Sequence, residues 1–549
     1  MSITREGSSS ACKTHSMEED GSDGQPPRED SLCSHSTVSP ASQGDGDLAN
    51  SDREDRVDNH HDKVNAALIA GDPEDIVSHV KEIENRGPTL LSGSDTVKVK
   101  IKQSAVAGNE TKNAVFLSIS FLSVFTSYMA IQNLQGSLND EESLGVISLG
   151  VLYGASILSG ILAPLIVTQL GVKRVILYSF IGHLIYTASN FYPSFATLIP
   201  SSVIIGIVTG PLWSCQGIYM TVCAVSYSQR TGTQMYASLS RFNGIFWAVF
   251  DLSNIIGNLV SSFVLYQSEY NVTSGNTSDF CGVNDCPDSE TQDKIADPEL
   301  YIVYILLSIF LVFVATGIGI VIMFLSPIES QFQRGDISAK DSFLSWFKVL
   351  QKTDMKYLIP FTCYLSIAEE VCFVEVTKSY ISCPIGIENV GYVMMVYGIS
   401  TSLSSFVLSR VTKYTKRHIL CGVAGMEQLA IFIWMCHWVP TEKDTAIIYA
   451  LLAAWGLGDG VWKTQINALL GEHFPRYLNS VFAVSEGFKS IAFTAAIGYS
   501  SVVCVYTKVI ITICFLSVGL LLYYFVEVRF IRKQKYLKND KTTEITETD

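Results

Sequence analysis

A succession of apolar segments, each about 20 residues long, is the feature of this sequence that most limits its fold. The segments fill the chain from residue 113 to residue 526, whereas residues 1–112 are rich in Ser, Asp, Glu and Gly. Twenty helical residues span about 30 Å, the thickness of the hydrocarbon core of a bilayer. Charged residues make up 16% of the 549 residues, against about 25% in soluble domains. The sequence therefore predicts an all-α membrane protein.

Twelve transmembrane helices are predicted, in two groups of six. Their ranges are 113–133, 144–166, 175–193, 196–222, 240–264, 301–325, 357–377, 389–409, 419–437, 445–469, 477–499 and 503–526. The corresponding domains are an N-terminal region (1–112), a first six-helix bundle (113–325), a linker (326–356), a second bundle (357–526) and a tail (527–549). The N-terminal region has no apolar core for a signal peptide, and its composition predicts that it is largely disordered.

The distribution of Lys and Arg predicts the orientation of the chain. The loops on the side of the N-terminus and the C-terminal tail hold twenty of these cations, whereas the opposite loops hold three, Lys294, Lys378 and Lys443. Cytoplasmic loops carry the excess of positive charge. We therefore expect the N-terminal region, the linker and the tail to be cytoplasmic.

The loop 265–300 is then outside the cytoplasm, and its motifs agree with that. It contains two N-glycosylation motifs, at Asn271 and Asn276, and the cysteines Cys281 and Cys286. Cys383 is also predicted on this side, where oxidising conditions permit a disulfide. Three cysteines allow three pairings, and the sequence does not choose between them. We expect the other ten cysteines to be small apolar fillers or free thiols.

The two groups of helices resemble each other in sequence. VLYGAS (151–156) in span 2 matches MVYGIS (395–400) in span 8, and LWSCQ (212–216) in span 4 matches VWKTQ (461–465) in span 10. A Lys-Arg pair follows at 173–174 and again at 416–417. Two six-helix halves in parallel repeat describe the major facilitator superfamily. The segment VTQLGVKR (167–174) keeps the Gly and basic pair of that superfamily's signature but lacks its acidic residue.

Four segments give a closer resemblance. They are YMAIQNLQGSLN (128–139), GPLWSCQGIYMT (210–221), EVTKSYISCPIGIENVGYVM (375–394) and WGLGDGVWKTQINALLG (455–471). Together they resemble the corresponding segments of the Unc-93 family, and the spacing of CGVNDC (281–286) resembles its homolog A branch. The resemblance covers 113–526. It implies a facilitator-fold accessory protein, because the founding member is regarded as a regulatory partner of a tandem-pore potassium channel and another branch escorts receptors.

Charged residues inside the apolar segments are the candidates for a functional site. Asp459 and Lys463 are four residues apart on span 10, and Asn467 continues the same face. Glu486 and Lys489 are three apart on span 11. An ionised side chain near the bilayer centre costs about 2.5–3.5 kcal/mol on insertion scales, so such pairs are expected to face the interior.

Other spans carry polar residues with no local counter-ion. Span 5 has Asp251, Asn254 and Asn258 on one face, and span 1 has Tyr128 and Gln132. Span 7 has Glu369, Glu370 and Glu375, of which Glu375 is expected to pair with Lys378.

One hypothesis is a central polar site in which Asp251 and Glu369 or Glu370 bind protons or cations and Asp459–Lys463 is a switchable pair. The other is that these contacts only lock helices together, at about 0.6–2 kcal/mol each.

Three functions remain open. The first is a regulatory subunit of a potassium channel or another membrane partner at the plasma membrane, with no enzymatic activity. The second is a proton- or cation-coupled transporter of small solutes, and the third is a trafficking escort for membrane proteins. The sequence shows no motif for a phosphate loop, a metal, a cofactor or nucleic-acid binding.

Overall fold

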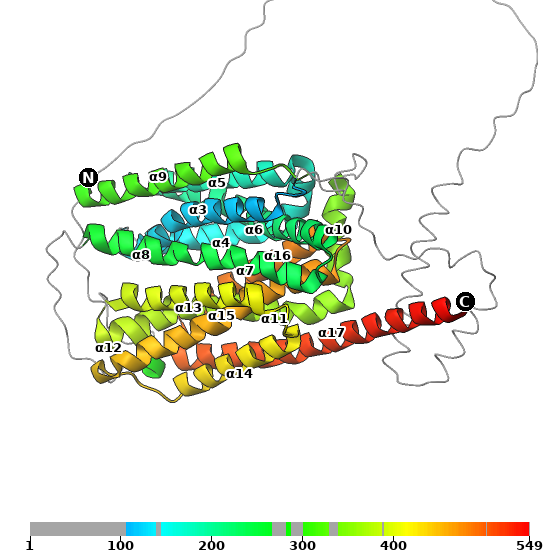
Figure 1. Cartoon of the computed structure of the whole chain (residues 1–549). Helices are drawn as coiled ribbons and strands as arrows, with labels where there is room; N and C mark the ends of the chain where they lie inside the picture. Colours follow the sequence, from blue (N-terminus) through cyan, green and yellow to red (C-terminus); the bar gives the residue numbers. More distant parts are fainter. Residues whose placement is uncertain are drawn as a thin grey trace, which may run out of the picture. The chain divides into compact units, whose positions relative to one another are not determined.

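The computed structural model describes residues 106–138, 144–265, 281–286, 300–328, 339–386, 389–500 and 502–547. All regular elements within these ranges are helices, and they run nearly parallel in two packed groups (Figure 1). The predicted N-terminal region up to residue 105 and the glycosylation motifs at Asn271 and Asn276 lie outside the described residues.

Within the described residues, the first group contains seven α-helices. They are α3 (Glu110–Leu138), α4 (Leu144–Leu170), α5 (Val172–Ser189), α6 (Phe195–Thr231), α7 (Met235–Phe250), α8 (Leu252–Leu265) and α9 (Leu300–Phe324). Between α8 and α9 lies the short helix η3 (Gly282–Asn284). We call the end of the bundle that carries Cys281–Cys286 the outer end. The opposite end, which carries the linking helix α10 (Ala339–Gln351), is the inner end.

The second group is built in the same way. It consists of α11 (Thr353–Glu370) with its continuation η5 (Val371–Ser382) and α12 (Cys383–Ile385), then α13 (Val390–Val411), α14 (Arg417–Met435), α15 (Thr445–His473), α16 (Leu478–Ser500) and α17 (Val505–Glu547). The short helix η7 (Glu442–Asp444) precedes α15. The helix α17 does not end near residue 526, as the sequence suggested, but extends beyond the inner end of the bundle (Figure 1).

Each of the twelve predicted spans coincides with a helix. Within the described residues, eleven helices are long and apolar enough to cross a membrane. The remaining span is α5, which has 18 residues and carries Lys173 and Arg174 in its first turn. The α7–α8 unit counts as one span, with a turn at Asp251.

Glycines allow the two groups to pack closely. A Cβ atom on Gly160 of α4 would lie 2.7 Å from the Cα atom of Gly487 on α16. One on Gly244 of α7 would lie 2.6 Å from the carbonyl oxygen of Ser405 on α13. Such contacts require a residue without a side chain, as is common where membrane helices approach closely. The groups therefore meet mainly through α4 with α16 and α7–α8 with α13.

Two spans contain an irregular turn at the depth of the bundle. The chain makes a turn at Asp251 between α7 and α8. The second irregularity is η5, a π-helix of twelve residues that directly follows Glu369 and Glu370. π-helical turns are rare and are frequent at functional sites. Both irregularities thus occur beside the acidic residues that the sequence identified.

Two disulfides join the outer loop of the first group to the second group. Cys281 is bonded to Cys383, which is one of the three pairings that the sequence left open. Cys286 is bonded to Cys504. The prediction that Cys504 is a filler or a free thiol was wrong, because the last helix begins at Val505 and leaves Cys504 in the preceding loop.

The repeated Lys-Arg pairs serve as anchors at the inner end. Gly171, with φ 80°, turns the chain into α5, and the Nζ atom of Lys173 donates to the carbonyl oxygen of Leu325 at 2.7 Å. A cation at the carbonyl end of a helix is favourable. Arg417 is buried, pairs with Glu472 and lies 4.8 Å from the centroid of the Tyr236 ring in the first group.

The glycine contact between α4 and α16 predicts a difference between two substitutions on one helix. Gly160→Ala places a methyl group against backbone, and overpacking of this kind costs about 1–3 kcal/mol. Gly154→Ala is the matched control, since a Cβ atom there meets nothing within 4 Å. Thermal unfolding in detergent should show a lower midpoint for Gly160→Ala only. Equal midpoints for the two variants would contradict the packing.

The second disulfide predicts the behaviour of a single cysteine variant. Cys504→Ser should leave Cys286 as a free thiol, which a maleimide should label in the purified protein. The peptide that is labelled in this variant but not in the wild type, identified by mass spectrometry, should contain Cys286 and not Cys281. The double variant Cys286→Ser/Cys504→Ser should return to the wild-type level. Release of Cys281 by Cys504→Ser would show that the pairing is different.

Candidate functional site

The ammonium group of Lys463 joins the two groups of helices. Its Nζ atom lies 2.8 Å from Oδ2 of Asp459, one turn earlier on α15, and 3.2 Å from Oδ1 of Asp251 in the turn between α7 and α8. Asp251 is 1% exposed and Lys463 17%. The pair predicted on α15 is therefore part of a three-residue bridge whose third member belongs to the other group.

Aromatic side chains surround this bridge. The hydroxyl of Tyr397 on α13 donates to Oδ2 of Asp459 at 2.7 Å. The Nζ atom of Lys463 lies 5.5 Å from the centroid of the Trp247 ring and 5.9 Å from that of Tyr397. Both distances allow a cation–π interaction, which strengthens when the cation is desolvated. The bridge is thus held by charge, hydrogen bonding and ring contacts together.

Glu369 on α11 extends the site through its electrostatic interactions. Its side chain is exposed to solvent, although it interacts electrostatically with Lys463 and Asp459 on α15 and with Lys489 and Glu486 on α16. Tyr128 on α3 and Tyr153 on α4 also interact with it. The groups that interact with Glu369 thus belong to helices of both halves.

We call Asp251, Glu369, Asp459, Lys463, Glu486 and Lys489 the central charge cluster. Lys489 pairs with Glu486 at 2.8 Å, as their spacing predicted. The cluster holds two more carboxylates than ammonium groups, and Oδ2 of Asp251 has no hydrogen-bond partner. A bound proton or monovalent cation near Asp251 would offset one of these two excess negative charges.

The remaining candidates lie on α3, α8 and α15. Gln132 donates to the hydroxyl of Tyr153 at 2.6 Å, and Tyr153 also interacts with Tyr128. Asn254 is buried on α8 with an unpaired side-chain oxygen, and Asn258 is half-buried one turn further on. Asn467 is buried on α15, one turn after Lys463.

Two sequence expectations for α11 and η5 need correction. Glu375 does not pair with Lys378. It pairs with Lys508 of α17 at 2.5 Å, and Lys378 pairs with Asp285 at 3.1 Å. The π-helix rotates Glu375 away from the position that α-helical spacing assigned to it. Glu370 is fully buried and interacts with Glu375 and Lys508, so it faces a different part of the structure from Glu369.

The sequence analysis did not identify several polar groups that the structure shows inside the bundle. Lys508 stands alone in an apolar run, which is a visible signal of a buried partner. Glu427 on α14 is likewise a charged residue in an apolar run. Both of its carboxylate oxygens are buried without a hydrogen-bond partner. The role of Tyr397 has no sequence signal, because only the packing of α13 against α15 brings its hydroxyl to Asp459. Among the described residues, no three His, Cys, Asp or Glu side chains are grouped so as to hold a metal ion.

Comparisons with known proteins agree with this architecture. Residues 138–524 match the family described as "Ion channel regulatory protein UNC-93". The chain is 35% identical over 425 residues to protein unc-93 homolog A of Danio rerio, covering 76% of this chain and 91% of the relative. It is 33% identical to the protein of the same name of Homo sapiens, covering 76% and 93%.

A more distant relative carries a functional description. The putative potassium channel regulatory protein unc-93 of Caenorhabditis elegans is 26% identical over 401 residues, which cover 70% of this chain and 56% of that protein.

Solved structures confirm the predicted fold of twelve helices in two halves. The E. coli fucose:proton symporter FucP superposes with a TM-score of 0.56 at 11% identity, covering 76% of this chain and 98% of that one. The human organic anion transporter MFSD10 superposes with a TM-score of 0.53 at 12% identity, covering 76% and 99%. At this level of identity the likeness concerns the fold alone.

The three-residue bridge predicts an order of stability among variants. Lys463→Met leaves Asp251 and Asp459 without their cation, and breaking a buried pair in this way costs about 3–5 kcal/mol. Asp459→Asn should cost less, because Lys463 keeps Asp251 and Tyr397 can still donate to the amide oxygen. Unfolding of the purified protein in detergent measures both.

The double variant Asp251→Asn/Lys463→Met is the control for this order. It removes the cation together with its partner in the other group, so it should be more stable than Lys463→Met alone. If the double variant is no more stable, the contact between Lys463 and Asp251 does not contribute to the bridge.

Proposed function

Because this chain belongs to the UNC-93 family, we propose that it is a regulatory subunit of a membrane partner, most specifically of a potassium channel. The observation that carries the proposal is the match of residues 138–524 to a family described as regulating ion channels. The relative from Caenorhabditis elegans, named as a putative potassium channel regulator, supports the same class of partner. The resemblance noted in the sequence narrows the channel to the tandem-pore type.

As a regulatory subunit, the protein is proposed to have no enzymatic activity. The charged groups inside the bundle pair mainly with one another, as Lys463 does with Asp251 and Asp459 and Lys489 does with Glu486. Side chains held in this way set the arrangement of helices and leave few groups free to react.

A regulator of a potassium channel acts at the plasma membrane, so this is where we place the protein. Both termini are then in the cytoplasm, as the distribution of Lys and Arg indicates.

The central charge cluster supports a second candidate function, the coupled transport of a small solute with a proton or cation. The excess of carboxylates and the accessible side chain of Glu369 favour this reading. Against it stands VTQLGVKR, in which the superfamily's acidic residue is missing between α4 and α5. In transporters of this architecture, substrate and coupling ion bind between the halves near the bilayer midplane.

A potassium-current measurement tests the regulatory proposal. Whole-cell current through a tandem-pore channel is recorded with and without this protein and divided by the amount of channel at the cell surface. A regulator changes the current per surface channel. Unchanged current per channel with more channel at the surface indicates a trafficking escort instead, and no change in either removes that channel as a partner.

Two variants connect the effect to the cluster. Asp459→Asn removes one carboxylate of the bridge and should reduce the change in current. Glu442→Gln is the matched control, since Glu442 is an exposed acid in η7, just before α15, and lies outside the cluster. An equal effect of both variants would contradict a role for the cluster.

The transport candidate has its own test. Asp251→Asn removes a carboxylate of the bridge and should abolish proton- or cation-coupled uptake into liposomes while the protein still folds. Uptake that persists in Asp251→Asn, or that is absent from the wild type, would count against transport at this site. Monodisperse size-exclusion profiles provide the control for folding.

A further inference from the structure

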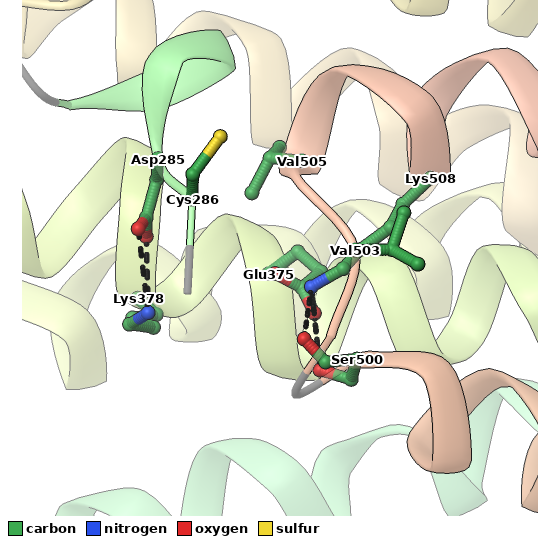
Figure 2. A pocket seen from close by; sticks show the side chains of 8 residues that line it. All are labelled: Asp285, Cys286, Glu375, Lys378, Ser500, Val503, Val505 and Lys508. Carbon is green, nitrogen blue, oxygen red and sulfur yellow. Dashed lines mark hydrogen bonds and ion pairs between the residues drawn. The ribbon is translucent and has the colours of Figure 1, made fainter. Parts of the chain in front are cut away.

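A small polar pocket lies at the outer end of the second group, apart from the central charge cluster. Its volume is about 180 Å³. Figure 2 shows the residues that line it, which are Asp285, Cys286, Glu375, Lys378, Ser500, Val503, Val505 and Lys508. They come from η5, from the loop that joins α16 to α17, from α17 and from the segment Cys281–Cys286. The outer loop of the first group thus contributes to a pocket in the second.

Ion pairs and hydrogen bonds hold the walls of this pocket. On one side, Lys508 donates to Glu375 at 2.5 Å and to the carbonyl oxygen of Ser500 at 2.7 Å (Figure 2). The side chains of Lys508 and Glu375 are 4% and 3% exposed. On the other side, Asp285 pairs with Lys378 and accepts a hydrogen bond from Ser379 at 2.6 Å. The charges of the pocket are therefore balanced within it.

The carboxyl group of Glu370 is not balanced in this way. It is completely buried, and neither oxygen has a hydrogen-bond partner. The ionisable groups that interact electrostatically with it are Glu375 on η5, Lys508 on α17 and Tyr499 on α16. The hydroxyl of Tyr499 is also buried without a partner, one residue before Ser500. An isolated carboxylate in such surroundings is unfavourable, so the group is neutral when no cation reaches it.

Glu370 does not itself line the outer pocket, but the π-helix relates it to Glu375, which does. Glu369 faces the central charge cluster, and the next residue in a helix points to a different side. Glu370 and Glu375 are five residues apart. In a π-helix, with hydrogen bonds from i to i+5, residues at this spacing are brought toward one face, whereas an α-helix aligns residues three or four apart.

We propose that Glu370 is a proton-binding site that exchanges protons with the outer side through this pocket. On release, the O–H bond of the Glu370 carboxyl group breaks and the proton is transferred to a water molecule or to the carboxylate of Glu375. Lys508 can then stabilise the carboxylate that is left, and uptake is the reverse. Asp285 and Cys286 form one wall of the pocket. The segment Cys281–Cys286, whose disulfides join the two groups of helices, therefore also lines the path of the proton.

This inference goes beyond the proposed regulation of a channel and does not depend on it. Glu369 belongs to the central charge cluster, whereas Glu370 interacts with Glu375 and Lys508, which line the outer pocket. Proton binding at Glu370 is measured on the protein alone, without a channel. A negative result for proton binding at Glu370 therefore leaves the proposed regulation of a channel untouched, and the reverse is also true.

The experiment uses the full-length protein in liposomes and dicyclohexylcarbodiimide, which modifies protonated carboxyl groups in apolar surroundings. The modified peptides are identified by mass spectrometry while the pH is changed on one side only. Labelling of Glu370 should fall as the outer pH rises, approaching about tenfold per pH unit above its titration point. Labelling that is absent at every pH, or that follows the inner pH only, would overturn the proposal.

Glu427 provides an internal control in the same sample. Its two oxygens are also buried without partners, but it faces Gly458 on α15 and interacts with Asp459. Its labelling should not follow the outer pH. If Glu370 and Glu427 respond in the same way, the response belongs to the bilayer or the reagent and the pocket route is wrong.

A pair of cysteine variants tests the route itself. Ser500→Cys places a thiol in the pocket, and a cationic, membrane-impermeant methanethiosulfonate reagent added outside should abolish the response of Glu370 to outer pH. Val502→Cys is the matched control, because Val502 is 72% exposed and does not line the pocket. A response that survives modification of Ser500→Cys, or that is lost equally in Val502→Cys, would show that protons do not pass through the pocket.

Discussion

The cost of a charge in an apolar interior is the constraint on which this structure depends, and Lys463 meets it by binding two carboxylates at once. Asp459 lies on the same helix, whereas Asp251 lies in the turn between α7 and α8 of the other group. The first half therefore depends on the second for the cation that pairs with Asp251. Removing Lys463 leaves two carboxylates without their cation, so the arrangement of the halves and the ionisation of the bridge are linked.

The rest of the fold keeps this bridge in place from both ends. At the centre, Gly244 and Gly160 allow the halves to approach until backbone meets backbone. At the outer end, both disulfides fasten the segment Cys281–Cys286 to the second group. At the inner end, Arg417 is buried against Tyr236 of the first group. Two halves that are joined by covalent bonds, ion pairs and close packing fit the proposed role as a regulator of a membrane partner. The charges in the interior support the alternative, transport coupled to an ion.

The sequence predicted the helices well because a membrane span needs one property, an apolar run of sufficient length. It also predicted the pair of Asp459 and Lys463, since both lie on one helix four residues apart. It did not predict contacts that depend on how helices pack, such as the bond from Tyr397 to Asp459. The predicted partner of Glu375 was wrong, because the prediction assumed α-helical spacing where the chain forms a π-helix. Cys504 was missed because the start of the last helix was placed two residues too early.

The distance between the two halves is the measurement that tests the role of the Lys463 bridge most directly. Spin labels at the exposed positions Arg174 and Lys413, one in each half at the inner end, report this distance by electron–electron double resonance. If the bridge sets the arrangement of the halves, Lys463→Met should shift or broaden the distance distribution, and Asp251→Asn/Lys463→Met should restore part of it. An unchanged distribution in Lys463→Met would show that packing and disulfides alone fix the halves, and the bridge would then lose its place in this account.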